Sequence, residues 1–239
     1  MKSKTKPETP NLPRRILAQI GRFGLTTRVV VAATLTAGNR DKARGRLRRL
    51  TASGRIHCHE YVVGKQRFVY YTRHPEPLTP RRLYASFATL WFCRMGRRRF
   101  NLLPRGQMLR LTAELRGMSE SLPSSAMSCA LYHMRDEPLP RIALIRVDRQ
   151  IDADHTDLNQ SVTDLDRFVS GLSFRMWRRL AMLERFVLLY LVCGRQNSVE
   201  LGRWLRRRPP VSRVAAPAVP LDVRVYPAMP LCFSDLPQR

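Results

Sequence analysis

Six of the 18 acidic residues lie in one stretch of the sequence, between positions 148 and 166. Clustered carboxylates are the groups that hold divalent metal ions for phosphodiester hydrolysis. Asp148 directly follows a short apolar segment at 141–147, where a metal-dependent nuclease can carry its first acid. The next apolar segment, at 186–193, contains no acid, and the chain has no lysine after Lys65. A nuclease with Asp148 in its site is therefore an alternative hypothesis, and helix capping by these aspartates is the favoured interpretation.

Other patterns that carry chemistry are incomplete. His57 and His59 share one face of a predicted strand, but no second pair of ligands has zinc spacing. The acidic residues around His155 lack the glycine and the spacing of a calcium loop. The sequence has no glycine-rich phosphate loop and no serine or cysteine beside a recognisable base. We therefore predict no cofactor, no metal and no catalytic residue, and the balance is against an enzyme.

Basic side chains dominate the composition. The chain has 43 lysines and arginines against 18 acidic residues, which gives a formal net charge of +25. Only five of the basic residues are lysines. Arginine makes bidentate contacts with guanine and phosphate that lysine cannot make. A GC-rich genome also enriches arginine, so the net charge is the stronger indication of a polyanionic partner.

Three helices are predicted early in the chain, at about 14–23, after Thr26 or Thr27, and at 40–53. Gly24 is placed to end the first helix. A threonine hydroxyl can cap the second helix, and Asn39 can cap the third after a short turn. Two strands rich in β-branched and aromatic residues follow, at 56–61 and 67–72, with Gly64 and Lys65 between them. This order predicts a winged helix-turn-helix over residues 12–73.

The third helix is the predicted recognition helix. Ala43, Leu47 and Leu50 are spaced for one buried stripe. The opposite side carries Asp41, Gly45, Arg48 and Ala52, so it is mostly small or cationic. Gly45 costs about 1 kcal/mol relative to alanine. A missing side chain lets a helix backbone approach a DNA groove closely. The predicted DNA-binding residues are Arg40, Lys42, Arg44, Arg48 and Arg49, with Lys65 and Arg67 from the hairpin, or wing.

Two other interpretations of this segment stay open. Any small three-helix domain with a hairpin has the same pattern, and its basic residues can simply be a solvated face. A basic structural protein that binds RNA or an acidic partner is a third functional hypothesis. In that case Phe68, Tyr70 and Tyr71 on the hairpin are candidates for stacking on bases.

The second half of the chain predicts a small α/β domain at 130–226. Strands are expected at 141–147, 186–193 and 221–226, with helices at 165–172, 174–185 and 198–208 between them. The expected fold class is α+β, with a winged helix-turn-helix followed by a three-stranded core sheet with helices. The other expected segments are a basic arm at 1–11, linking helices at 79–116 starting with one at 79–95, a flexible boundary at 117–128, and a tail at 227–239.

Five scattered cysteines without a CxxC pair indicate a reducing compartment and buried thiols. The first 11 residues lack the apolar core of a signal peptide. No apolar run approaches the length of a membrane span. A cytoplasmic protein with no membrane partner is expected.

The winged-helix pattern over 13–72, followed by RIALIRVD and FVLLYLVCG, resembles the replication-relaxation proteins of plasmids and other mobile elements. In that family a winged helix precedes an α/β block. The resemblance implies DNA binding tied to replication, mobilisation or transcription regulation of an element, and it supplies no catalytic residue. The leading hypothesis is a non-catalytic protein that binds duplex DNA as a homodimer.

Overall fold

The structure is a computed structural model, and it describes residues 11–63, 65–95, 101–102, 128–132, 141–148, 157–170, 186–207 and 222–228. The chain divides into two compact units, unit 1 from Met1 to Pro77 and unit 2 from Leu78 to Arg239. None of the described helices is both long enough and apolar enough to cross a membrane.

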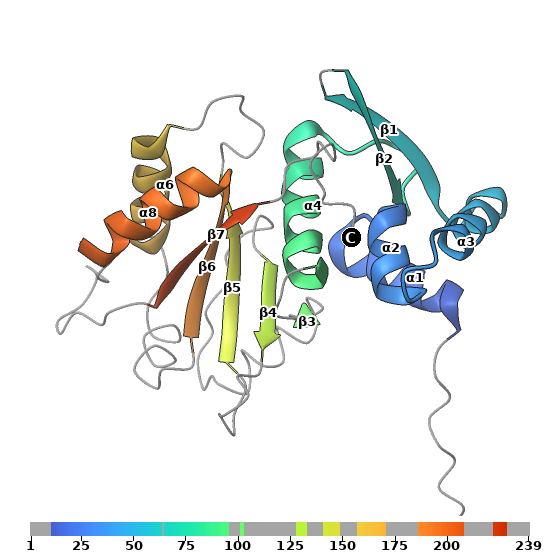
Figure 1. The fold of residues 1–239 in the computed structure, drawn as a ribbon, viewed down its shortest axis with the longest axis horizontal. Helices are drawn as coiled ribbons and strands as arrows, with labels where there is room; N and C mark the ends of the chain where they lie inside the picture. Colours follow the sequence, from blue (N-terminus) through green and yellow to red (C-terminus); the bar gives the residue numbers. More distant parts are fainter. Residues whose placement is uncertain are drawn as a thin grey trace, which may run out of the picture. The chain divides into compact units, whose positions relative to one another are not determined.

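Unit 1 consists of three helices followed by an antiparallel hairpin, which is the order that a winged helix has (Figure 1). The predicted arrangement is confirmed at this level. The strands run further toward the turn than the sequence indicated, which makes the hairpin longer. The elements are α1 (Leu12–Phe23), α2 (Arg28–Leu35), α3 (Arg40–Ala52), β1 (His57–Val63) and β2 (Gln66–Thr72).

Polar side chains cap all three helices of unit 1. The side-chain oxygens of Asn11, Thr27 and Asn39 accept hydrogen bonds from backbone N–H groups three residues further on, at 3.1, 3.3 and 2.7 Å. Gly24 ends α1 with a φ of 81°, a left-handed conformation that costs glycine little. The predicted caps at Thr27 and Asn39 are confirmed, and Asn11 is an additional one.

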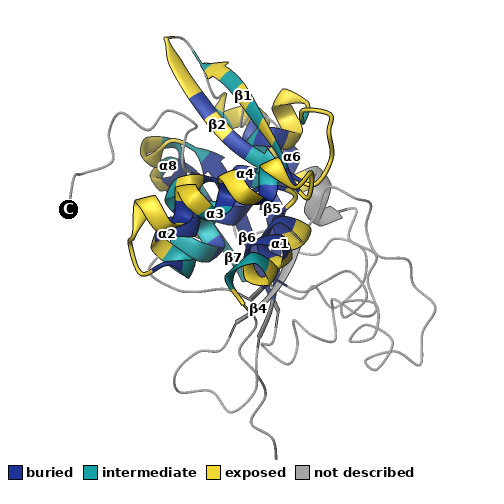
Figure 2. Cartoon of the chain, turned by 90° about the vertical axis from the view of Figure 1, so that its right-hand side faces the viewer, coloured by how far each residue is buried: buried dark blue, intermediate teal, exposed yellow. Residues whose placement is uncertain are grey.

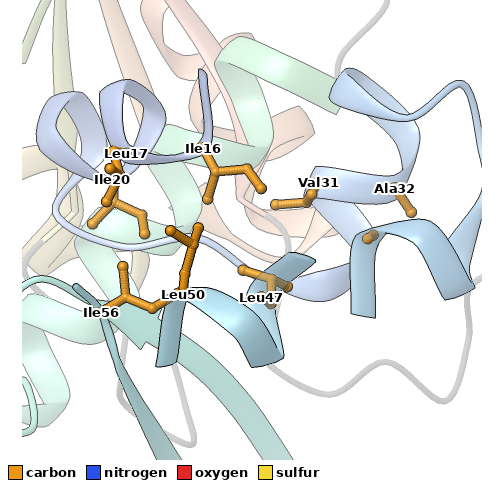
Figure 3. Packing of buried hydrophobic residues seen from close by; sticks show 9 residues of the cluster. Ile16, Leu17, Ile20, Val31, Ala32, Leu47, Leu50 and Ile56 are labelled. Atoms are coloured by element: carbon orange, nitrogen blue, oxygen red, sulfur yellow. The ribbon is translucent and has the colours of Figure 1, made fainter. Parts of the chain in front are cut away.

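The core of unit 1 lies where the three helices meet the start of the hairpin (Figure 3). The predicted stripe of α3 points into this core, with Ala43 and Leu47 fully buried. Ile56, just before β1, is also fully buried and anchors the hairpin to α3. Each buried leucine or isoleucine contributes roughly 1.5–3 kcal/mol of transfer free energy. The cluster comprises Ile16, Leu17, Ile20, Val31, Ala32, Ala43, Leu47, Leu50 and Ile56.

One buried glutamine joins α1 to the α1–α2 connection. Gln19 is 3% exposed, and its amide nitrogen donates to the hydroxyl of Thr26 at 2.8 Å. Its amide oxygen accepts from the Thr34 hydroxyl of α2 at 3.4 Å. The buried amide is therefore paired on both sides, as a buried polar group must be to avoid a desolvation penalty.

Unit 2 contains a five-stranded sheet in the order β3-β4-β5-β6-β7. Its β5–β6 and β6–β7 pairs are parallel, and its β3–β4 and β4–β5 pairs are antiparallel. The predicted core of three strands is confirmed, and β5 and β6 have the predicted bounds. The strands are β3 (Asn101–Leu102), β4 (Ser128–Tyr132), β5 (Arg141–Val147), β6 (Phe186–Cys193) and β7 (Val223–Ala228).

The strands β3 and β4 were not predicted, and they correct the expected number of strands. The sequence of β4, SCALY, contains no β-branched residue and starts in the small, polar stretch that resembled a boundary. The segment therefore has a weak intrinsic tendency to form a strand. Its antiparallel pairing with β5 stabilises the strand. The strand β7 also extends two residues beyond its predicted end.

Helices cover both faces of this sheet. Tyr190 of β6 and Tyr226 of β7 point to opposite faces, because Tyr226 is in register with Leu191. The ring of Phe92 in α4 (Pro80–Met95) lies 5.0 Å from that of Tyr226. On the other face of the sheet, the charge of Asp164 in α6 (Leu158–Ser170) helps to raise the pKa of Tyr190. On that face α6 also contacts α8 (Arg195–Arg207). This double coverage explains the unbroken apolar sequence of β6.

The helices of unit 2 correct several predicted boundaries. The helix α6 begins at Leu158, because the carboxylate of Asp157 accepts from the backbone N–H of Asn159. The helix α8 begins at Arg195, directly after Gly194. The helices expected after Pro104 and at 174–185 lie outside the described residues. On α4 the predicted apolar face is buried, with Trp91 half-buried.

Candidate nucleic-acid interface

The outward face of α3 carries the densest group of predicted site residues. Because Ala43, Leu47 and Leu50 face the core, most cationic residues of this helix are exposed (Figure 2), and Arg46 is half-buried. Among the described residues, none of them is ion-paired with an acidic side chain, and Asp41 is the one acid on the helix. The exposed cationic residues of α3 are Arg40, Lys42, Arg44, Arg48 and Arg49.

Gly45 interrupts this face without serving the fold. A Cβ atom added at Gly45 would meet no atom within 4 Å, and the residue does not have a positive φ. Alanine would therefore fit, and it would stabilise the helix by about 1 kcal/mol. Packing inside this chain does not account for the glycine. A flat surface that an external molecule approaches closely does account for it.

The predicted wing residues are separated from this face. Lys65 is exposed at the tip of the hairpin, whereas the base of the hairpin follows the end of α3 (Figure 1). A strand of this length spans on the order of 20 Å. Arg67 is exposed and lies 3.8 Å from the carboxylate of Glu60, an exposed ion pair of little strength. The seven predicted residues thus form two groups, one on α3 and one near the tip.

Tyr71 at the base of the hairpin and Arg28 at the start of α2 belong to the surface beside α3, and they were missed as a pair. Burial raises the pKa of Tyr71, with a further contribution from Cys58, and the guanidinium groups of Arg28 and Arg44 oppose this rise. The phenol therefore lies within electrostatic reach of both arginines. Arg28 is the first residue of α2, and a cation at that end of the helix dipole is unfavourable. An arginine at the start of a helix was therefore the sequence signal that could have identified Arg28 as a site residue.

The hairpin corrects the expectation that its aromatic residues stack on bases. Phe68 and Tyr70 are 2% and 1% exposed, because they share the inner face of the hairpin. The ring of Tyr70 lies 5.2 Å from that of His59 and 6.0 Å from that of Phe68. Two of the three aromatic residues are therefore inaccessible, and Tyr71 is half-buried.

His59, one of the two hairpin histidines, has hydrogen-bonding neighbours within unit 1. The Nε2 atom of His59 lies 2.9 Å from the hydroxyl of Thr72 and 3.2 Å from the carbonyl oxygen of His74. In the part of the chain that the structure describes, no group of three or more metal-ligating side chains occurs. Cys58 is exposed, which is opposite to the expectation of buried thiols, and Cys93 in α4 is buried as expected.

The Asp148 carboxylate lies in a buried polar cluster under α6. Asp148 is 2% exposed and accepts a hydrogen bond from the hydroxyl of Ser161 at 2.5 Å. Asp164 is 5% exposed, and both acids raise the pKa of the fully buried Tyr190 beyond the effect of burial, which Arg146 opposes. This arrangement engages Asp148 with neighbours from β6 and α6. Asp152 and Asp154 lie outside the described residues.

The chain matches no protein-family model, and no curated protein and no solved structure is significantly similar to it. The resemblance to replication-relaxation proteins therefore rests on the order of the elements alone.

Proposed function

We propose that the protein binds duplex DNA without catalysis, with α3 as the recognition helix. The observation that carries this proposal is the outward face of α3, which is cationic, free of ion pairs among the described residues, and interrupted by Gly45. A major groove admits a helix, and arginine pairs bidentately with guanine edges. Arg44 and Arg48 are the residues proposed to contact base edges, and Arg49 is proposed to contact bases or phosphates.

The other predicted residues are proposed to contact the DNA backbone. Arg40 and Lys42 lie in the first turn of α3, where backbone contacts are usual. Lys65 and Arg67 extend the contact along the duplex, because the hairpin tip is remote from α3. Tyr71 lies within electrostatic reach of Arg28 and Arg44. A further phosphate contact is therefore proposed from Arg28 and the Tyr71 hydroxyl, beside Arg44.

The proposal includes the biological setting that the family resemblance implies. The order of a winged helix and an α/β block supports a role in replication, mobilisation or transcription regulation of a plasmid or mobile element. A homodimer is part of this proposal, because two copies of α3 read two half-sites. Light scattering of the protein with and without duplex measures the number of copies in solution.

The first test is binding to a 30-base-pair duplex and to its single strand over a salt series, with and without magnesium. Duplex preference with steep salt dependence and intact DNA supports the proposal. The R44A/R48A variant should bind at least tenfold more weakly. Its matched control is R14A/R15A, which removes two exposed arginines from the first turn of α1 and should change affinity little.

Three results contradict the proposal. An unchanged affinity of a folded R44A/R48A variant removes α3 from the interface. Tighter binding to the single strand favours the basic, RNA-binding interpretation. Shortened DNA in the presence of magnesium, abolished by D148A, favours the nuclease hypothesis.

A further inference from the structure

The helix α8 of unit 2 presents a second cationic face. Ser198, Leu201 and Leu205 are its buried residues, and α8 packs on β6 and β7. At 100° per residue, the sector opposite those three residues is centred near Gln196 and Arg203, and Arg195 lies at its edge. Four of its side chains are exposed arginines, and its one acid, Glu200, is half-buried. The side chains of this face are Arg195, Gln196, Val199, Glu200, Arg203, Arg206 and Arg207.

These arginines are available to a ligand. Among the described residues, no acidic side chain forms an ion pair with any of the four. The one acid of the helix, Glu200, lies within this sector and accepts a hydrogen bond from the amide of Gln196 at 3.1 Å. The face therefore carries four arginines against one half-buried carboxylate and is strongly cationic.

Stability of the helix does not explain all of this charge. Arg206 and Arg207 lie in the last turn, where cations interact favourably with the helix dipole. Arg195 is the first residue of α8, whose first turn has no acid, and there the dipole disfavours a cation by about 0.3–1 kcal/mol. A polyanion bound along the helix reverses that sign, because it interacts favourably with both the arginine and the helix N-terminus.

We propose that the outward face of α8 binds the phosphate backbone of duplex DNA without reading its sequence. From Arg195 to Arg206 the helix rises about 16 Å, and a duplex carries one phosphate charge per roughly 1.7 Å of its axis. The arginines are thus spread over a length that offers each of them a phosphate. A lipid surface fits less well, because Val199 is the one exposed apolar residue of this face, and Trp204 at its edge is half-buried.

The inference rests on the proposed duplex binding and assigns unit 2 a share of it. Its test compares the full-length wild type with R195Q/R203Q, which leaves the stabilising arginines of the last turn in place. The matched control is R81Q/R82Q, which removes two exposed arginines from the first turn of α4 in the same unit. Thermal unfolding checks that all three proteins are folded.

The affinity for a 30-base-pair duplex is measured from 50 to 200 mM salt, values chosen because counterion release is large in this range. For R195Q/R203Q we expect about tenfold weaker binding and a slope of log K against log salt that is smaller by about 2. The loss should be equal for duplexes of different sequence. The control should keep the wild-type slope.

Equal losses in both variants, or no loss in R195Q/R203Q, overturn the inference. It is also overturned if vesicles with anionic phospholipid bind the wild type and the control but not R195Q/R203Q, while duplex affinity stays the same. The two proposals fail separately. If R44A/R48A keeps full affinity and R195Q/R203Q loses it, α8 binds DNA and the role of α3 is wrong.

Discussion

The backbone of Tyr71 in β2 pairs with the backbone of Thr26 in the α1–α2 connection. The N–H group of Thr26 donates to the carbonyl of Tyr71 at 3.0 Å, and the N–H group of Tyr71 donates back at 2.9 Å. This bridge adds a third extended segment beside the hairpin. Because Thr26 stands two residues before Arg28, the bridge fixes the start of α2 next to the hairpin base. Arg28 of α2, Arg44 of α3 and Tyr71 at the hairpin base thereby share one surface.

Replacing Gly45 with alanine should separate stability from DNA binding. The new Cβ atom has open space around it, so the free energy of unfolding should rise by about 0.5–1 kcal/mol. In a complex the same methyl group would separate α3 from the groove, and duplex affinity should fall. Urea unfolding and duplex titration measure the two effects.

Gly21 of α1 provides the control for that experiment. A Cβ atom there would contact the Arg73 guanidinium at an ordinary 3.7 Å, so Gly21→Ala should also be accepted. It should not weaken DNA binding, since α1 is not the proposed recognition helix. Equal affinities of Gly45→Ala and wild type would show that no ligand needs the close approach at α3.

Loss of the α3 cap should destabilise unit 1 by about 1 kcal/mol. The side chain of Asn39 accepts from the backbone N–H of Lys42 at 2.7 Å, and Asn39→Ala leaves that donor without its partner. Asn39→Asp keeps the acceptor and should retain the stability. Urea unfolding of the three proteins measures the difference. Equal destabilisation by both substitutions would mean that the amide, not the capping oxygen, is what unit 1 requires.

Unit 1 was predictable because its signals are local. Asn39 and Thr27 cap helices through bonds within one turn, and Leu47 and Leu50 share a stripe that helical periodicity alone defines. The strand β6 of unit 2 was predictable for the same reason. Its apolar run indicated a strand buried on both faces, and six consecutive residues from Val187 to Val192 are indeed buried. Each of these features depends on residues that are neighbours in the sequence.

The features that were missed depend on contacts between distant residues. The Thr26–Tyr71 bridge and the pairing of β4 with β5 have no local signature. Phe68 and Tyr70 were treated like Tyr71, although alternation along β2 sends the first two to the inner face and the third to the outer face. Which face is buried is decided by tertiary packing, and sequence alternation alone does not choose between them.

The stability of unit 2 should fall at alkaline pH through Cys93. Burial raises the pKa of this thiol from 9.0 to about 12, with the charge of Arg94 opposing the rise. The folded state keeps the proton while the unfolded state releases it above pH 9. Stability from this group is therefore full below pH 9 and is lost progressively up to about pH 12.

Comparison with Cys93→Ala isolates this effect from other groups that titrate in the same range. By pH 10 the wild type should lose about 1.4 kcal/mol more than the variant, relative to pH 7. Urea unfolding at the two pH values measures the difference. Parallel losses in the two proteins would mean that the Cys93 thiol has the same pKa in the folded and the unfolded chain.

Cys58 provides a direct probe of the surface where DNA is proposed to lie. The thiol of Cys58 is exposed, and Cys58 is the cross-strand partner of Tyr71. The charges of Arg28 and Arg44 oppose the rise in the pKa of Tyr71, so both arginines lie near this site. A saturating 30-base-pair duplex should cover this thiol and slow its reaction with iodoacetamide several-fold, as followed by mass spectrometry of the modified peptide. High salt should restore the rate, because phosphate contacts weaken steeply as salt rises. At the same DNA concentration R44A/R48A should show little protection, and an unprotected Cys58 in the saturated wild-type complex would place the DNA away from the hairpin base.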